Sequence, residues 1–165
     1  MMKNNRKKLF HIIAHYLVAA LVLGQVAATI FGGSVEIVES VRLAGWILLV
    51  ISGVFGWLPV YELRSKGGVS AGAGFVNTTV LVDSGVYSIV RHPQFLGGIF
   101  LGVALMLISQ YWLVVVLGIP VVLLFILAII EDDKQSLEKF GDDYRDYMDR
   151  VPQANLAAGL LRKLK

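Results

Sequence analysis

The chain contains no cysteine among its 165 residues. Disulfide bonds are therefore excluded, and so is catalysis by a thiol. The chain is also not itself a substrate for prenylation or palmitoylation, because both reactions need a cysteine side chain. Stability and any chemistry must come from other residue types.

Charge is scarce as well, because Asp, Glu, Lys and Arg make up only 16% of the chain, while hydrophobic residues make up 56%. A soluble domain usually has roughly 25% charged residues. The shortage is concentrated in three stretches without a charged side chain, at 9–31, 43–61 and 92–130. A helix needs about 20 apolar residues to cross the hydrocarbon layer of a bilayer. The composition therefore predicts an all-α integral membrane protein.

The lengths of these stretches predict about four transmembrane helices. The first two stretches fit one span each, whereas the third has 39 residues and predicts a helical hairpin that turns at Ser109 and Gln110. The first arm of the hairpin is short and is not expected to reach far across the bilayer. We expect one membrane domain over 1–165. The predicted spans are 9–31, 43–61, 94–108 and 111–130.

Four basic residues precede the first stretch, as they do in a secretory signal peptide. The apolar core of this stretch has 23 residues, whereas the core of a signal peptide usually has about 7–15. No polar region and no clear small-residue cleavage motif follow it. We expect this segment to be retained as a membrane helix.

The basic residues predict the orientation of the chain. With four spans and a cytoplasmic N-terminus, segments 1–8, 62–91 and 131–165 face the cytoplasm and hold 14 of the 15 Lys and Arg residues. Only Arg42 falls on the other side. Positive residues accumulate in cytoplasmic loops, so both termini are predicted to be cytoplasmic. The net charge of +3 fits basic segments that face anionic lipid and does not indicate nucleic-acid binding.

The C-terminal segment predicts two amphipathic helices. The acidic residues 131–133 directly follow the last span and are expected at its end. Apolar residues then recur at spacings of three and four, which is typical of one helix face. Pro152 is expected to end this helix, and 156–165 mixes leucines with basic residues, which predicts an interfacial helix. The apolar stripe consists of Leu137, Phe140, Tyr144, Tyr147 and Val151.

Two polar groups are expected to meet at the cytoplasmic end of the hairpin. One arm carries the Arg-His-Pro sequence 91–93 at its start, and Pro93 suits its first helical turn, where the missing N–H costs nothing. The other arm ends at the acidic residues 131–133. The arms are antiparallel, so a guanidinium, an imidazole and carboxylates converge at one membrane surface. Such a cluster is either a functional site or a set of structural ion pairs, and both readings stay open.

Two other patterns carry less weight. His11 and His15 are four residues apart and present two candidate metal ligands on one helix face. No cysteine or carboxylate lies near them in that segment, so no metal site is predicted. Gly72 and Gly74 belong to a Gly-rich stretch, but the full dinucleotide-binding motif is absent.

Several short motifs in fixed order resemble the isoprenylcysteine carboxyl methyltransferase family and, more loosely, phospholipid methyltransferases. Gly-Val-Tyr at 85–87 and Arg-His-Pro-Gln-Phe-Leu-Gly at 91–97 resemble the family's G-x-Y and R-H-P-x-Y-x-G signature. Glu131 and Asp132 resemble its acidic pair. Residues 140–152 resemble its F-G-x-x-Y-x-x-Y ending, followed by R-V-P. The resemblance covers about half of the chain.

This resemblance implies S-adenosylmethionine as cofactor, bound without a Rossmann domain by segments 66–93 and 131–155. Arg91 and His92 are candidates for positioning residues, and no catalytic residue is assigned. A methyl sulfonium is cationic, so carboxylates and aromatic faces favour it. The motif does not decide whether Glu131 or Asp132 corresponds to the acid of the family. The implied cofactor contacts are Leu81, Val82, Tyr87, His92, Pro93, Gln94, Phe95, Glu131 and Asp132.

The sequence also departs from the family pattern. Phe95 replaces a tyrosine, Asp132 replaces a glutamate, and 123–130 lacks the arginine that serves the substrate in eukaryotic carboxyl methyltransferases. The resemblance thus implies a methyltransferase for a lipidic or prenylated membrane substrate, with the methyl acceptor left open. Two alternatives remain, namely an NADPH-dependent enzyme similar to sterol reductases and a non-enzymatic membrane scaffold. Gln94 argues against the reductase, whose related motif has asparagine there.

Overall fold

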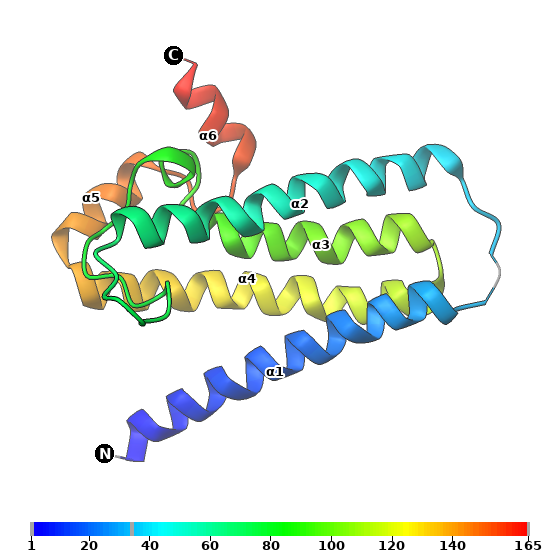
Figure 1. The fold of residues 1–165 in the computed structure, drawn as a ribbon, viewed down its shortest axis with the longest axis horizontal. Coiled ribbons are helices and arrows are strands. Elements are labelled where there is room, and N and C mark those ends of the chain that lie inside the picture. Colours follow the sequence, from blue (N-terminus) through cyan, green and yellow to red (C-terminus); the bar gives the residue numbers. More distant parts are fainter. Residues whose placement is uncertain (1, 34, 165) are drawn as a thin grey trace. The chain divides into compact units, whose positions relative to one another are not determined.

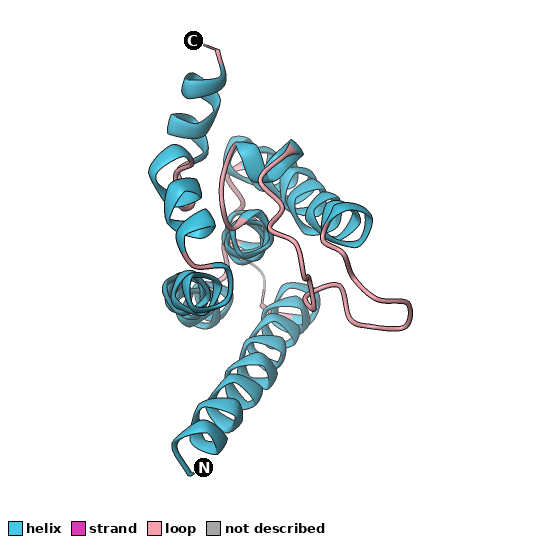
Figure 2. Cartoon of the chain, turned by 90° about the vertical axis from the view of Figure 1, so that its left-hand side faces the viewer, coloured by secondary structure: helices cyan, strands magenta, loops and turns pink. Residues whose placement is uncertain are grey.

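The computed structural model describes residues 2–33 and 35–164, and their side chains from residue 13 onward. Every regular element in this part of the chain is helical (Figure 2), so the all-α prediction is confirmed. The side chain of His11 lies outside the described residues. The elements, shown in Figure 1, are α1 (Met2–Phe31), α2 (Glu39–Lys66), the 3-10 helix η1 (Gly85–Ser88), α3 (Pro93–Ser109), α4 (Trp112–Phe140), α5 (Asp142–Arg150) and α6 (Leu156–Lys163).

Three described helices are long and apolar enough to cross a membrane, and α3 is a shorter apolar helix. With 17 residues, α3 is about 25 Å long, while the hydrocarbon layer is about 30 Å thick. Large apolar side chains along the long helices are exposed, among them Leu23, Val50 and Leu127, as expected for faces in contact with lipid. The chain is a multi-pass membrane protein, as predicted, with α3 as the short arm of the hairpin.

The chain forms two compact units, and α2, α3 and α4 each contribute a part to both. The first unit comprises Met1–Val50 and Ile99–Phe125. The second unit comprises Ile51–Gly98 and Ile126–Lys165. The single domain expected over 1–165 stays a prediction.

The hairpin turn organises one end of the first unit. The α3 helix ends at Ser109, Gln110 adopts a φ of 52°, and α4 begins at Trp112. The turn predicted at Ser109 and Gln110 is therefore present. The Gln110 side chain accepts a hydrogen bond from the Val38 N–H and donates one to the Val38 carbonyl, both at 3.0 Å. These bonds tie the connection between α1 and α2 to the hairpin turn.

A buried amide joins α1 to the hairpin within the first unit. Gln25 of α1 is fully buried, and its Nε2 donates to the carbonyl oxygens of Gly102 at 3.3 Å and Val114 at 3.1 Å. Gly118 leaves room for this amide, because a Cβ at that position would collide with it. Polar side chains that bond across helices help to hold membrane helices together.

In the second unit, α2 and α3 approach each other closely. The Ser52 hydroxyl donates to the Gly97 carbonyl at 2.8 Å. A Cβ at Gly97 would lie 3.0 Å from the backbone of Phe55 and Gly56. The α3 helix begins at Pro93, as predicted, because a proline in the first turn loses no helical hydrogen bond.

The last long helix does not end at the acidic residues, contrary to the expectation from the sequence. The α4 helix continues through 131–133 to Phe140, and the break falls at Gly141, whose φ is 60°. No Gly or Pro occurs in 131–140 to end the helix sooner, whereas glycine adopts a positive φ readily. The apolar stripe is thus divided between two helices, although its members still pack together. This cluster contains Leu137, Phe140, Tyr144, Tyr147 and Val151.

Candidate functional site

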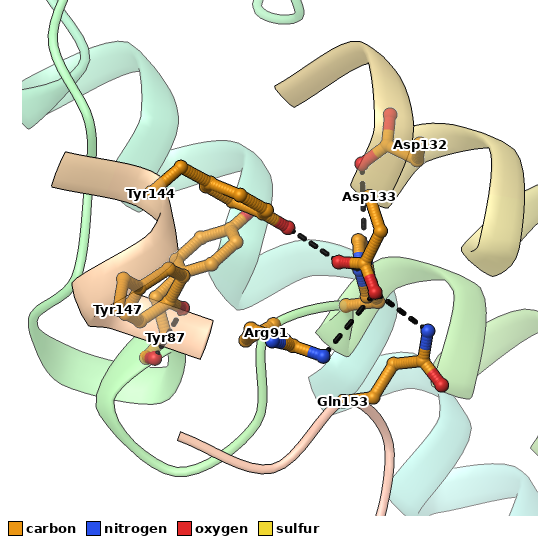
Figure 3. Close-up of polar contacts among 8 residues, drawn as sticks. Tyr87, Arg91, Asp132, Asp133, Tyr144, Tyr147 and Gln153 are labelled. Atoms are coloured by element: carbon orange, nitrogen blue, oxygen red, sulfur yellow. Dashed lines mark hydrogen bonds and ion pairs between the residues drawn. The ribbon is translucent and has the colours of Figure 1, made fainter. Parts of the chain in front are cut away.

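Asp133 of α4 lies at the centre of the polar cluster. Its carboxylate is buried, and Oδ1 accepts a hydrogen bond from the Tyr144 hydroxyl at 2.6 Å and lies 2.7 Å from His92 Nε2. Its Oδ2 accepts hydrogen bonds from the Arg91 guanidinium at 3.2 Å and the Gln153 amide at 2.6 Å. Figure 3 shows Arg91, Tyr144 and Gln153 reaching this carboxylate from three separate segments. One carboxylate therefore joins α4, α5 and the segments that precede α3 and α6.

His92 lies between two carboxylates. Its Nε2 is 2.7 Å from Asp133 Oδ1, and its Nδ1 is 3.2 Å from Asp132 Oδ2. A neutral imidazole donates only one hydrogen bond, whereas the imidazolium donates from both nitrogens. Burial by itself lowers the pKa of His92, but hydrogen bonds and negative charge from Asp132 and Asp133 outweigh burial and raise the pKa. A carboxylate at each ring nitrogen favours the imidazolium, which can donate to Asp132 and Asp133 together and so orient both acids.

The backbone of the Arg-His-Pro segment is held by the segment that follows α5. The Arg91 N–H donates to the Pro152 carbonyl at 3.0 Å, and the His92 N–H donates to the Gln153 carbonyl at 3.2 Å. The side chain of Gln153 also reaches Asp133. Two motifs that are distant in the sequence therefore form one hydrogen-bonded unit.

A second buried acid positions η1, the turn before this cluster. Glu62 of α2 is 6% exposed, and its Oε2 accepts a hydrogen bond from the Val86 N–H at 3.1 Å. Gly85 has a φ of 60°, and any side chain there would collide with the Glu62 carboxylate. On the other side, the Tyr147 hydroxyl donates to the Tyr87 carbonyl at 2.6 Å. In the sequence, only one feature singles out Glu62, namely that it is an acid near the end of an apolar stretch.

The cluster borders a pocket with a volume of about 400 Å³. The walls come from the end of α2, the loop before η1, η1 and the start of α3, the end of α4, and α5. Small-molecule sites usually have volumes of roughly 300–1,000 Å³. The pocket is therefore large enough for a cofactor or a substrate headgroup.

Eight of the nine implied cofactor contacts line this pocket, and the candidate positioning residue Arg91 lines it too. Glu131 does not line it, and its carboxylate lies 3.7 Å from Lys134 Nζ of the same helix. The geometry thus favours Asp132 over Glu131 as the acid that contacts a ligand. The lining members of the implied set are Leu81, Val82, Tyr87, His92, Pro93, Gln94, Phe95 and Asp132.

The pocket offers a carboxylate and several aromatic rings to a ligand. Burial raises the pKa of the Tyr87, Tyr144 and Tyr147 hydroxyls, so these groups remain protonated donors at neutral pH. The Phe95 ring lies 5.8 Å from the His92 ring. A carboxylate beside aromatic faces stabilises a compact organic cation. Within the described side chains, no three His, Asp or Glu residues gather as a set of metal ligands.

Two comparisons with known proteins identify the family of this chain. The phospholipid methyltransferase family model matches residues 41–142. The chain belongs to the phospholipid methyltransferase family. A curated relative, Protein-S-isoprenylcysteine O-methyltransferase from Schizosaccharomyces pombe, is 24% identical over 150 residues, which is 81% of this chain and 64% of the relative. The chain thus spans less than two thirds of that relative's length. No solved structure matches the chain.

The family match covers only part of the cluster. It includes Arg91, His92, Asp132 and Asp133, and it ends at the first residue of α5. The residues that close the cluster from beyond this match are Tyr144 and Gln153. The completed site therefore depends on contacts that the matched region does not contain.

Proposed function

We propose that this protein is an S-adenosylmethionine-dependent methyltransferase that acts on a lipidic or prenylated membrane substrate. One observation carries the proposal. Family motif positions from separate segments line a single cofactor-sized pocket in a chain of the phospholipid methyltransferase family. Its mixed lining of carboxylate, hydroxyl, amide and aromatic groups suits a cofactor that has an aromatic ring and several polar groups.

The residues of the pocket fit a cofactor that carries a positive charge. When bound, S-adenosylmethionine supplies a methyl group on a cationic sulfur. The Asp132 carboxylate and the aromatic faces of Tyr87 and Phe95 favour such a cation. His92 lies 3.2 Å from Asp132, so the acid is oriented before the ligand arrives. Methyl transfer needs the nucleophile, the methyl group and the sulfur in line, and holding them there supplies much of the rate enhancement.

The proposed substrate class follows from the position of the pocket and from the family. The pocket lies where α3 begins, and α3 is an apolar helix of a multi-pass membrane protein. The names of the family and of the curated relative refer to phospholipids and to an isoprenylcysteine. Both are amphiphiles whose polar end lies at the membrane surface, so a pocket at that level suits either one.

We also propose that both termini are cytoplasmic, because 14 of the 15 basic residues fall in segments on one side of a four-span arrangement. A reporter fused after Lys165 tests this orientation. It should be active only in a form that works in the cytoplasm. Activity of a reporter that works only on the opposite side would overturn the orientation.

Calorimetric titration of the purified protein in lipid nanodiscs tests the cofactor. We expect S-adenosylhomocysteine to bind and NADPH not to bind. Binding of NADPH alone would overturn the proposal and favour the reductase-like alternative. A folded protein that binds neither compound would favour a scaffold without enzymatic activity.

Two neighbouring acids provide a matched pair of variants for the same titration. Asp132→Asn should weaken binding of the cation S-adenosylmethionine roughly tenfold or more, because a charge-assisted contact contributes about 1.5–3 kcal/mol. The same change should weaken binding of S-adenosylhomocysteine less, because its sulfur is neutral. Glu131→Gln should bind like the parent, because Glu131 points away from the pocket. Both variants should melt like the parent without ligand. Equal loss of binding in the two variants would contradict the role assigned to Asp132.

A further inference from the structure

The α6 helix presents an apolar face that no described part of the protein covers. Its exposed leucines, Leu160 and Leu161, are followed by Leu164 just beyond the helix, and the three are 45%, 63% and 83% exposed. Together with Ala157 they follow the spacing of one helix face. An exposed apolar stripe of this kind needs an apolar environment.

The opposite face of α6 is attached to the segment that carries the site. Gly159 packs so closely on Ile89 that a Cβ there would collide with the Ile89 carbonyl. The Arg162 guanidinium donates a hydrogen bond to the Ser88 carbonyl. These contacts set the rotation of α6, so its leucines point away from the protein.

The attachment also holds α6 close to the start of α3. Ser88 and Ile89 lie only a few residues before Pro93, where the apolar α3 begins. Figure 1 shows α6 directed sideways from the parts of α2 and α4 that belong to the same unit. A helix attached next to the start of an apolar helix, and directed across these parts of α2 and α4, is in a position to lie on the membrane surface.

Charge indicates which kind of surface suits α6. Arg162 and Lys163 occupy its last turn, and no acidic residue occurs in 150–164. Basic residues beside an apolar helix face favour membranes that contain anionic lipids. The apolar face and the charge therefore favour the same partner.

We propose that α6 docks on an anionic phospholipid surface, with its leucines in the interfacial layer and the Lys163 ammonium at the headgroups. Docking then stabilises segment 85–92 through the contacts that Gly159 and Arg162 make with it. This proposal concerns the membrane surface and does not depend on methyl transfer.

The absence of native cysteine makes a direct test of docking possible. Leu161→Cys and, as a matched control off the stripe, the exposed Ala158→Cys each receive a nitroxide label in the full-length protein. The nanodiscs contain phosphatidylcholine with phosphatidylglycerol. The label at 161 should be accessible to dissolved oxygen and shielded from a water-soluble nickel complex, and the label at 158 should show the reverse. Equal access of the nickel complex to both labels would overturn the proposal.

A second copy of the chain is the rival occupant of the apolar face. Spin–spin broadening of the label at 161 that disappears on dilution with unlabelled protein would identify that copy and overturn lipid docking. An unbroadened spectrum together with shielding from nickel supports the membrane.

Lipid charge is tested with Lys163→Gln, which removes a charge that makes no contact with the site. In nanodiscs with phosphatidylglycerol, the ratio of docked to undocked label should fall roughly fivefold in this variant, which is the expected effect of one basic residue near an anionic surface. The parent should also dock less in pure phosphatidylcholine. A ratio that is the same in both lipid compositions would overturn the requirement for anionic lipid.

Hydrogen exchange tests the link from α6 to the site without any ligand. The Ile89 and Val90 amides donate to the Val86 carbonyl at 3.0 Å and 3.2 Å. In the double variant Leu160→Ser with Leu161→Ser, these amides should exchange several-fold faster than in the Ala158→Ser control. Exchange at the control rate would show that docking does not stabilise this segment, and it would leave the proposed methyl transfer untouched.

Discussion

Two buried polar groups, one in each compact unit, differ in how completely they are hydrogen-bonded. Gln25 in the first unit donates twice, but its Oε1 has no partner within the described residues. Asp133 in the second unit is contacted by four side chains. An unpaired neutral acceptor costs about 1–3 kcal/mol, whereas an unpaired buried carboxylate costs far more. An amide can therefore serve as a simple helix tether, but a carboxylate needs a complete set of partners.

This difference explains why the polar cluster around Asp133 lies in the second unit. Helices in lipid satisfy their own backbone hydrogen bonds, so the first unit needs few polar side chains. The partners of Asp133 come instead from segments outside the long apolar runs, namely 91–92, α5 and the segment after it. The polar cluster can form only where such segments return to the helix ends.

The largest effect is expected from Asp133→Ala. Its removal leaves the Arg91 guanidinium and the His92 ring without their shared partner, and breaking a buried ion pair costs about 3–5 kcal/mol. Thermal unfolding in detergent should show early melting or failure to extract a folded protein. Asp132→Ala is the control and should melt much closer to the parent, because its side chain is 45% exposed. Equal melting of Asp133→Ala and the parent would contradict the central place of Asp133.

A smaller loss of stability is expected at Glu62. Substitutions there test whether a buried acid with fewer contacts is as sensitive as Asp133 or as tolerant as Gln25. Glu62→Ala leaves the buried Val86 N–H unpaired, which costs about 1–3 kcal/mol. Glu62→Gln keeps an acceptor and should lose less. Thermal melting and the affinity for S-adenosylhomocysteine provide the measurements. If the glutamine variant is as unstable as the alanine variant, the negative charge and not the hydrogen bond holds η1.

A pH dependence is expected from His92. Its pKa is raised in the folded protein, so its contribution to stability is fully present below the unfolded pKa of about 6.5 and is lost as pH rises through the folded pKa. The melting temperature of the parent should therefore fall over this range, and that of His92→Gln should fall less. Parallel pH profiles of the two proteins would argue against an imidazolium between Asp132 and Asp133.

The smallest effect is expected from Gln25→Leu. The variant loses two interhelical hydrogen bonds, each worth about 0.6 kcal/mol on average within a membrane, but it also removes an unpaired buried acceptor. Stability should change by less than about 1 kcal/mol, and ligand binding should not change. Gln25→Ala is the matched control and should be less stable, because it leaves a cavity. A large loss in Gln25→Leu would show that the amide does more than tether α1.

Much of the fold could be predicted from the sequence because the apolar runs are long and nearly free of charge. The hairpin turn at Gln110 and the start of α3 at Pro93 also followed from local chemistry. The predicted end of α4 is wrong, because three acidic residues do not by themselves end a helix. Charged side chains on a helix end can remain in water while the backbone continues, and only Gly141 changes the backbone conformation.

The sequence alone determined that this is a multi-pass membrane protein with an acidic group opposite an Arg-His-Pro segment. It did not determine the separate roles of the three acids, because neighbouring residues on a helix point about 100° apart. The structure directs Asp133 toward Arg91 and His92, Asp132 toward the pocket, and Glu131 toward Lys134. The rotation of α4 about its axis sets these directions, and contacts with segments distant in the sequence set that rotation.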